Sequence, residues 1–219
     1  MRAFMSYQTA DKLIAANIAE LLAEVGCTAF MAHEHIQVSE EWRIQILSEL
    51  EVADLFVPIL SKNYYGSIWC KQESGIAAFR KITVIPLSTD GAIPEGFIGH
   101  IQSTKIDPAA PKLVDLLPGL AKHDVKFVID VLIPIIAKSG NYRGAEFNFE
   151  LILPYIGKAT DEQVVQLLEA SAKNGQICHA SRCATIYLPP LFASHGKLMN
   201  KDLHAELGAV LKQYEQFKK

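Results

Sequence analysis

The sequence predicts an α/β protein, in which a parallel sheet is covered by helices on both faces and is followed by a smaller, mainly helical domain. Over about the first half of the 219 residues, short apolar strand patterns alternate with helical patterns, which is typical of βαβ units with right-handed crossovers. After a proline-bearing stretch at 108–118 the alternation ends. We therefore expect one domain at 1–107, a linker at 108–121 and a second domain at 122–219.

The composition is that of an ordinary globular protein. Half of the residues are hydrophobic, 21% are charged, and the net charge of −3 gives no case for a general nucleic-acid binder. The four cysteines follow no disulfide-framework spacing, and there is neither a signal-peptide pattern nor an apolar run near the ~20 residues of a membrane helix. These features predict a cytoplasmic protein with free thiols and no membrane association.

The segment from Leu55 to Glu73 carries the most information about function. Its first six residues form a continuous apolar run, as expected of a strand buried on both faces. A polar loop follows, and Ser67 is a suitable N-cap for the next helix. Trp69 and Glu73 are four residues apart and share one helix face. A carboxylate beside a large aromatic, just past the carboxyl end of a buried strand, lies where open α/β sheets bind ligands.

The other elements of the first domain follow in order along the chain. Further strands are expected at Ala3–Ser6, Thr28–Met31, Ile82–Leu87 and Ile101–Ile106. Further helices are expected at Asp11–Glu24 and Glu40–Leu50. Five parallel strands joined in this way fit a flavodoxin-like order.

The second domain shows helical periodicity and then two short apolar runs. Helices are expected at Val125–Lys138, Ala145–Tyr155, Thr160–Lys173, where Thr160 begins a capping box, and Lys201–Phe217. The runs Gln176–Ala180 and Ala184–Leu188 are expected to pair as a hairpin, so the domain is predicted to be winged-helix-like. Its third helix carries three acidic residues against one lysine, which disfavours DNA binding and favours a partner, oligomerisation or sensing role.

Three motifs of the first domain occur in a recognisable order. They are Ala3-Phe4-Met5-Ser6-Tyr7, the set Ser61…Tyr64…Ser67-Ile68-Trp69-Cys70…Glu73, and Val84-Ile85-Pro86-Leu87. With them, residues 1–107 resemble a TIR domain, the Toll/interleukin-1 receptor module. The resemblance implies self-association and, in the bacterial enzymatic members, cleavage of NAD⁺ with the helix glutamate, here Glu73, as the essential residue. It also implies a setting such as innate immunity or antiphage defence. One departure is that the loop His33–Trp42 lacks the usual Gly and Pro.

The chemistry of NAD⁺ explains why one carboxylate suffices. Hydrolysis of an O-glycoside needs two carboxyl groups, because the leaving oxygen must be protonated. Nicotinamide leaves NAD⁺ as a neutral base, so the remaining task is to stabilise the oxocarbenium-like ribose with one fixed anion. Glu73 suits that task, although most glutamates are merely solvated.

Four further residues are candidates for binding NAD⁺. Trp69 could stack on the substrate or belong to the core. Ser6 and Ser61 end strands at the same sheet edge and could bond ribose or phosphate, or could be ordinary turn residues. Phe4 is more simply a core residue.

The predicted function is that of an NAD⁺ glycohydrolase or cyclase that takes NAD⁺ as its substrate and needs no cofactor. Activation by self-association is expected, with the second domain controlling assembly. No P-loop or dinucleotide fingerprint occurs, and Cys178, His179, Cys183 and His195 fit no common zinc spacing. Two alternatives stay open: a non-catalytic TIR scaffold, and a nucleoside deoxyribosyltransferase-like enzyme with a catalytic glutamate.

Overall fold

The structure is a computed structural model that describes residues 1–31 and 41–215. The chain forms two compact units, Met1–His123 and Asp124–Lys219. The expectations for the loop at 33–40 lie outside the described residues.

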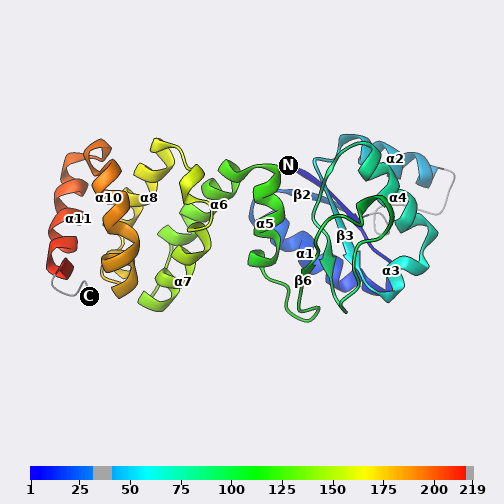
Figure 1. Ribbon diagram of the computed structural model, residues 1–219, viewed down its shortest axis with the longest axis horizontal. Coiled ribbons are helices and arrows are strands. Elements are labelled where there is room, and N and C mark those ends of the chain that lie inside the picture. The colour runs from blue at the N-terminus through cyan, green and yellow to red at the C-terminus, as the bar shows by residue number, and fades with distance from the viewer. Residues whose placement is uncertain (32–40, 216–219) are drawn as a thin grey trace. The chain divides into compact units, whose positions relative to one another are not determined.

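The first unit is built on a parallel sheet (Figure 1). Its strands are β1 (Arg2–Ser6), β2 (Thr28–Met31), β3 (Leu55–Leu60), β4 (Thr83–Val84), β5 (Leu87–Ser88) and β6 (Thr104–Lys105). The order is β2-β1-β3-β5-β6, and β4 also pairs with β3. β4 and β5 pair with successive parts of β3, so they occupy one strand position in the sheet. With that position counted once, the sheet has five parallel strand positions, and the predicted flavodoxin-like parallel sheet is confirmed.

The expected strand at 82–87 is interrupted in the structure. Pro86 has no N–H group, so it cannot continue a ladder of hydrogen bonds. The N–H of Ile85 still donates to the Phe56 carbonyl at 2.9 Å. Pairing with β3 resumes at Leu87, and the result is two strands of two residues each.

Five α-helices accompany the described part of this sheet. They are α1 (Lys12–Glu24), α2 (Glu41–Val52), α3 (Lys62–Gly66), α4 (Ile68–Phe79) and α5 (Leu113–His123), with short 3₁₀ turns at Thr9–Asp11 and Gly96–Ile98. The predicted cap of α4 is confirmed, because the Ser67 hydroxyl accepts from the Cys70 N–H at 3.3 Å. The segment after β3 was expected to be a loop, but Ser61 caps it into the short helix α3.

Helix α5 occupies most of the stretch that was expected to be a linker. It belongs to the first unit and buries Leu116, Leu117 and Leu120. Gly119 permits a close approach to the sheet, because a Cβ atom there would lie 2.5 Å from Cγ2 of Ile85. The boundary between the units therefore follows His123, later than the sequence pattern indicated.

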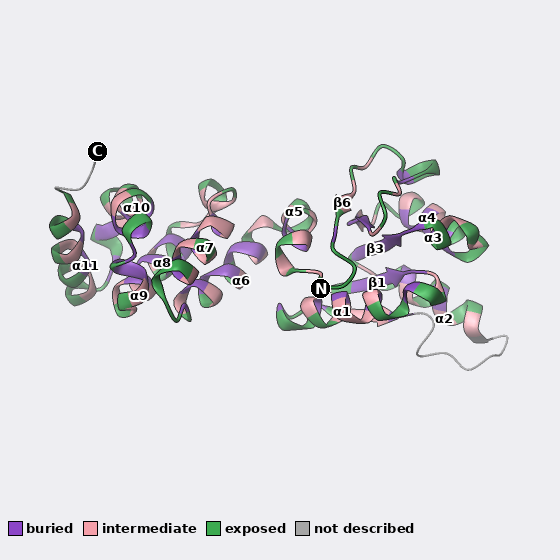
Figure 2. Cartoon of the chain, turned by 90° about the horizontal axis from the view of Figure 1, so that it is seen from below, coloured by how far each residue is buried: buried purple, intermediate pink, exposed green. Residues whose placement is uncertain are grey.

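The core of the first unit lies between the sheet and its helices. All six residues of β3 are buried, and Figure 2 shows the buried strands β1 and β3 beside helices with exposed outer faces. Phe4 and Phe56 stack with centroids 6.0 Å apart and pack with Ile46 and Leu50 of α2. Burial of these large apolar side chains is the main stabilising contribution to the unit.

The regular secondary structure of the second unit's described residues is entirely helical. Its helices are α6 (Val125–Ala137), α7 (Tyr142–Ile152), α8 (Asp161–Lys173), α9 (Gly175–Cys178), α10 (Leu188–His195) and α11 (Lys201–Tyr214), with 3₁₀ turns at Ile156–Lys158 and Gly196–Leu198 and a π-helix at Cys183–Tyr187. The expected capping box of α8 is confirmed, since Thr160 and Gln163 exchange side chain to backbone hydrogen bonds.

The predicted hairpin of the second unit is wrong. Residues 176–178 belong to α9, 179–180 form a turn, and 184–188 belong to the π-helix and the start of α10. The described residues therefore hold no wing, and the winged-helix assignment falls with it. Ile177, Ala180, Ala184 and Leu188 are all buried, so the apolar residues of these runs are core residues in or next to α9, the π-helix and α10. Each run alone was too short to distinguish a strand from a buried helix.

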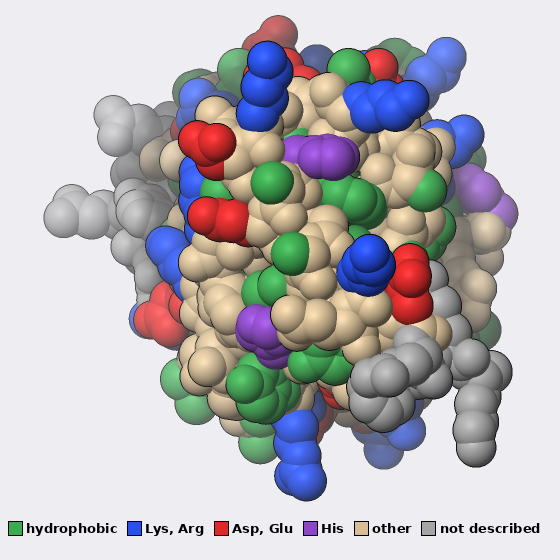
Figure 3. Space-filling view, turned by 90° about the vertical axis from the view of Figure 1, so that its left-hand side faces the viewer, with side chains coloured by type: hydrophobic (Ala, Val, Ile, Leu, Met, Phe, Trp, Pro, Cys, Tyr) green, Lys and Arg blue, Asp and Glu red, His purple; other side chains and the backbone are tan. Residues whose placement is uncertain are grey.

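One face of the second unit is shown in Figure 3, and it is mixed in charge. On the face shown in Figure 3, basic and acidic side chains are interspersed with small hydrophobic areas and form no continuous basic stripe. None of the described helices is both long and apolar enough to cross a membrane.

Candidate active site

Glu73 lies in the second turn of α4, on the face that packs against the sheet. Its side chain is only 4% exposed, which is rare for a glutamate. The cap at Ser67 sets where α4 begins, and that start turns Glu73 inward. The sequence placed this carboxylate at the sheet edge, and the structure shows that it is a buried one.

Three hydroxyl groups lie in a row from the Glu73 carboxylate. Oγ of Ser6, at the end of β1, donates to Oε2 of Glu73 at 2.5 Å. Oη of Tyr64 lies 3.0 Å from Oγ of Ser6 and 2.8 Å from Oγ of Ser74. The Cys70 carbonyl accepts from Tyr64 at 3.2 Å and from Ser74 at 2.9 Å. Residues 67 positions apart in sequence thus share one buried network.

Burial determines the acidity of this site. It raises the pKa of Glu73 to about 7, and the hydrogen bond from Ser6 opposes that rise. Burial also raises the pKa of Cys70 to about 11 and raises the pKa of Tyr64 above its usual value. Around neutral pH Tyr64 and Cys70 are therefore protonated, while Glu73 can exchange a proton.

The other residues predicted to bind NAD⁺ differ in whether the structure leaves them accessible to a ligand. Ser61 donates to Oδ2 of Asp11 at 2.6 Å and caps α3, so its hydroxyl is already used. Phe4 lies in the core. Trp69 is 37% exposed and meets Trp42 edge to face, with centroids 4.0 Å apart. Of the four, Trp69 is the one with surface available to a ligand.

A shallow cavity of about 710 Å³ lies beside Trp69. It is lined by Gln8, Lys62, Asn63, Gly66, Ser67, Ile68, Trp69 and Gln72. The lining contains one cation, three side-chain amides and no carboxylate, and its volume is in the range of small-molecule sites. Its residues follow β1 and β3, so the cavity opens at the carboxyl edge where ligands of such sheets bind.

Sequence reasoning missed Tyr64, Ser74, Gln8 and Lys62. Tyr64 and Lys62 stood in a segment that was expected to be a polar loop, and Tyr64 was quoted as part of the family motif but given no role in the site. The only signal for Ser74 was its place next to Glu73. Their roles depend on which elements pack together, and short-range patterns do not carry that information.

Comparison with families of known proteins matches residues 3–115 to the TIR domain. The chain belongs to the TIR domain family. The match spans more than half of the chain and includes every candidate site residue named above. Comparisons with curated proteins and with solved structures found no match.

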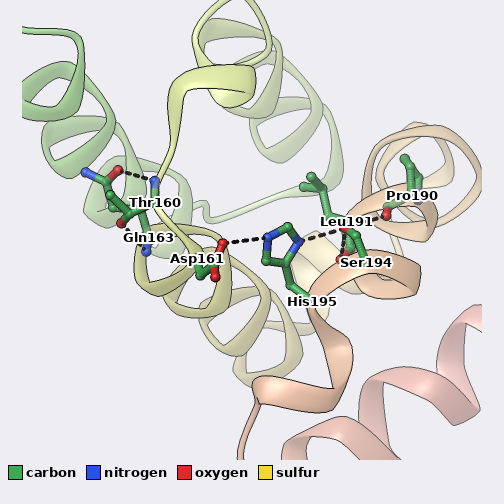
Figure 4. A network of polar contacts seen from close by, with 7 residues as sticks. All are labelled: Thr160, Asp161, Gln163, Pro190, Leu191, Ser194 and His195. Atoms are coloured by element: carbon green, nitrogen blue, oxygen red, sulfur yellow. Dashed lines mark hydrogen bonds and ion pairs between the residues drawn. The ribbon is translucent and has the colours of Figure 1, made fainter.

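Outside the TIR domain, the second unit contains a Ser-His-Asp contact (Figure 4). Nδ1 of His195 lies 2.7 Å from Oγ of Ser194, and Nε2 lies 3.3 Å from Oδ1 of Asp161. However, the Ser194 hydroxyl also donates to the Pro190 carbonyl, and Asp161 is 83% exposed. A catalytic triad needs a buried, orienting carboxylate. This contact instead joins the end of α10 to the start of α8, where the negative charge of Asp161 suits the helix dipole.

The cysteines of the second unit are buried packing residues. Cys178 and Cys183 have little exposed surface, and burial raises the pKa of both thiols. Among the residues that the structure describes, no three His, Cys, Asp or Glu side chains form a group able to hold a metal ion.

Proposed function

We propose that the TIR domain cleaves the bond between nicotinamide and ribose in NAD⁺. Glu73 carries this proposal, as a buried carboxylate one helical turn from Trp69, which lines the cavity together with Lys62. The bond between C1′ and the pyridinium nitrogen breaks, and its electron pair leaves with neutral nicotinamide. The ribose becomes oxocarbenium-like, and a fixed anion stabilises that charge more in the transition state than in the ground state.

The raised pKa of Glu73 suits the second half of the reaction. Water attacks C1′ and must lose a proton, and a carboxylate with a pKa of about 7 accepts it near neutral pH. If a ring nitrogen of the substrate's own adenine attacks instead, the product is a cyclic isomer of ADP-ribose. Both products follow from the same first step.

The cavity supports a placement for the substrate. Trp69 offers an aromatic face one helical turn from Glu73, which suits the nicotinamide or ribose. Lys62 lines the cavity, and the exposed Asp90 carboxylate accepts from its backbone N–H at 2.9 Å, which leaves the Lys62 side chain to bind the pyrophosphate. We place the phosphates near Lys62 and the reacting ribose near Trp69.

Burial of Glu73 also supports activation by self-association. With 4% of its surface exposed, the carboxylate cannot contact C1′ until its neighbours move. TIR domains self-associate, and we propose that assembly opens the site, with the second unit controlling that assembly. A setting in the cytoplasm, in defence against phage, would fit such a conditional NADase.

The test is to incubate the protein with NAD⁺ over a wide range of protein concentrations. Nicotinamide and the ADP-ribose species are separated by chromatography. Glu73→Gln should abolish nicotinamide release, and Glu24→Gln, on the exposed end of α1, should not. Retention of most of the wild-type rate by Glu73→Gln would show that the carboxylate is not catalytic.

A second candidate function is a non-catalytic TIR scaffold. The same burial favours it, because a carboxyl group satisfied by Ser6 can serve structure alone. The scaffold predicts self-association that is unaffected by NAD⁺ and no nicotinamide release at any protein concentration. Sedimentation of the chain with and without NAD⁺, beside the turnover assay, separates the two functions.

A further inference from the structure

We propose that Ser6 and Tyr64 are positioning residues that form a hydroxyl relay to Glu73, with Ser74 and the Cys70 carbonyl at its far end. The relay holds the carboxylate in one orientation and keeps it hydrogen-bonded in both protonation states. The catalytic role of the relay rests on the proposed function, because it serves Glu73 in NAD⁺ cleavage. It differs from the sequence-based expectation that Ser6 contacts the ribose or the phosphates.

The burial of Ser6 and Tyr64 indicates that these residues position Glu73 and do not contact the substrate. Ser6 and Tyr64 are each 0% exposed, and both hydroxyls already bond to Glu73 or to each other, so their contacts are to the carboxylate network and not to the cavity. Ser6 is fixed by the pairing of β1 with β3, where it lies opposite Pro58. Tyr64 belongs to α3, which begins directly after β3. Two backbone elements therefore fix the hydroxyls relative to α4.

The donors and acceptors balance when Glu73 is ionised. The carboxylate can only accept, so the Ser6 hydroxyl donates to it. The oxygen of Ser6 then accepts from Tyr64, and the oxygen of Tyr64 accepts from Ser74. The distances of 2.5, 3.0 and 2.8 Å suit these three bonds.

The donors and acceptors also balance when Glu73 is protonated. Its carboxyl group donates to Ser6, Ser6 donates to Tyr64, Tyr64 donates to Ser74, and Ser74 donates to the Cys70 carbonyl. Only hydroxyl rotations separate the two states, and no heavy atom moves. Once the site is open, Glu73 can thus take up the proton from attacking water and release it again while the hydroxyl relay stays in place.

Among the described residues, a hydrogen bond and not a neighbouring charge favours the ionised form of Glu73. The titratable groups that face Glu73 are Tyr64 from α3 and Cys70 from α4, and both stay neutral because burial raises the pKa of each. No charged side chain among the described residues of the packed elements shifts the pKa of Glu73. The Ser6 hydroxyl is the only group among them that favours the anion.

The experiment measures kcat/KM for nicotinamide release between pH 5 and 9. Ser6→Ala should move the acidic limb of the profile to higher pH, so that the rate at pH 6 falls about tenfold while the high-pH plateau changes less. Tyr64→Phe should act in the same direction with about a threefold loss. Tyr65→Phe is the matched control, since its hydroxyl donates to the Ile93 carbonyl outside the relay, and its profile should equal that of the wild type.

A second readout follows the protonation of Glu73 without turnover. The pH dependence of unfolding should move to higher pH in Ser6→Ala and in Tyr64→Phe. If Ser6→Ala and Tyr64→Phe release nicotinamide with the same pH profile as the wild type and Tyr65→Phe, the relay is overturned and the proposed function stays intact. If no protein releases nicotinamide but the unfolding transition moves as expected, the relay holds and the proposed function fails.

Discussion

Glu73 should make the TIR domain less stable as pH rises. A shift of its pKa from 4.5 to about 7 corresponds to about 3 kcal/mol, at about 1.4 kcal/mol for each pKa unit. The folded state holds the proton more tightly than the unfolded state, so stability decreases between these two pH values. Above pH 7 the folded protein carries the whole cost of a buried anion. That cost is a large part of the ~5–15 kcal/mol of a typical domain.

Glu73→Gln removes this cost and keeps the shape of the side chain. The amide oxygen can still accept from Ser6, but it does not ionise. The stability of the variant relative to the wild type should therefore increase by about 3 kcal/mol between pH 4.5 and pH 8. The change in this difference with pH is the quantity of interest, because a constant offset can arise from the new N–H donors.

Urea unfolding monitored by tryptophan fluorescence gives this difference directly. Both tryptophans of the chain, Trp42 and Trp69, lie in the first unit, so the signal reports on the TIR domain alone. Glu24→Gln should follow the wild type at every pH. A difference between Glu73→Gln and the wild type that stays constant from pH 4.5 to pH 8 would contradict the reasoning from burial.

Three further predictions concern other parts of the chain. Lys62→Gln should raise KM for NAD⁺ but not for nicotinamide riboside, which has no phosphate; equal effects in steady-state kinetics on both substrates would remove the phosphate role. Gly119→Ala should lower stability by about 1–3 kcal/mol in urea unfolding, because the new methyl group would overlap Ile85, and an unchanged midpoint would contradict this close packing. A fragment of residues 124–219 should fold alone with a purely helical circular-dichroism spectrum and should not bind duplex DNA at physiological salt, because α8 is acidic; a strand signal or salt-sensitive binding would count against it.

Local patterns predicted much of the fold because their signals lie within a few residues of each other. The apolar run of β3, the caps at Ser67 and Thr160, and the spacing of Trp69 and Glu73 each depend on neighbouring positions. The alternation of such elements was enough to predict the parallel sheet. The hairpin failed for a related reason, since runs of five residues do not distinguish a strand from a buried helical turn.

The candidate site depended on the tertiary structure. The sequence alone identified Glu73 and its helix face, through the motif around it. Only the packing of β1, α3 and α4 brought Ser6 and Tyr64 to its carboxylate, removed the carboxylate from water and thereby raised its pKa. Desolvation and hydrogen bonding depend on what surrounds a group in space, and residues 67 positions apart in sequence carry no local sign that they will meet.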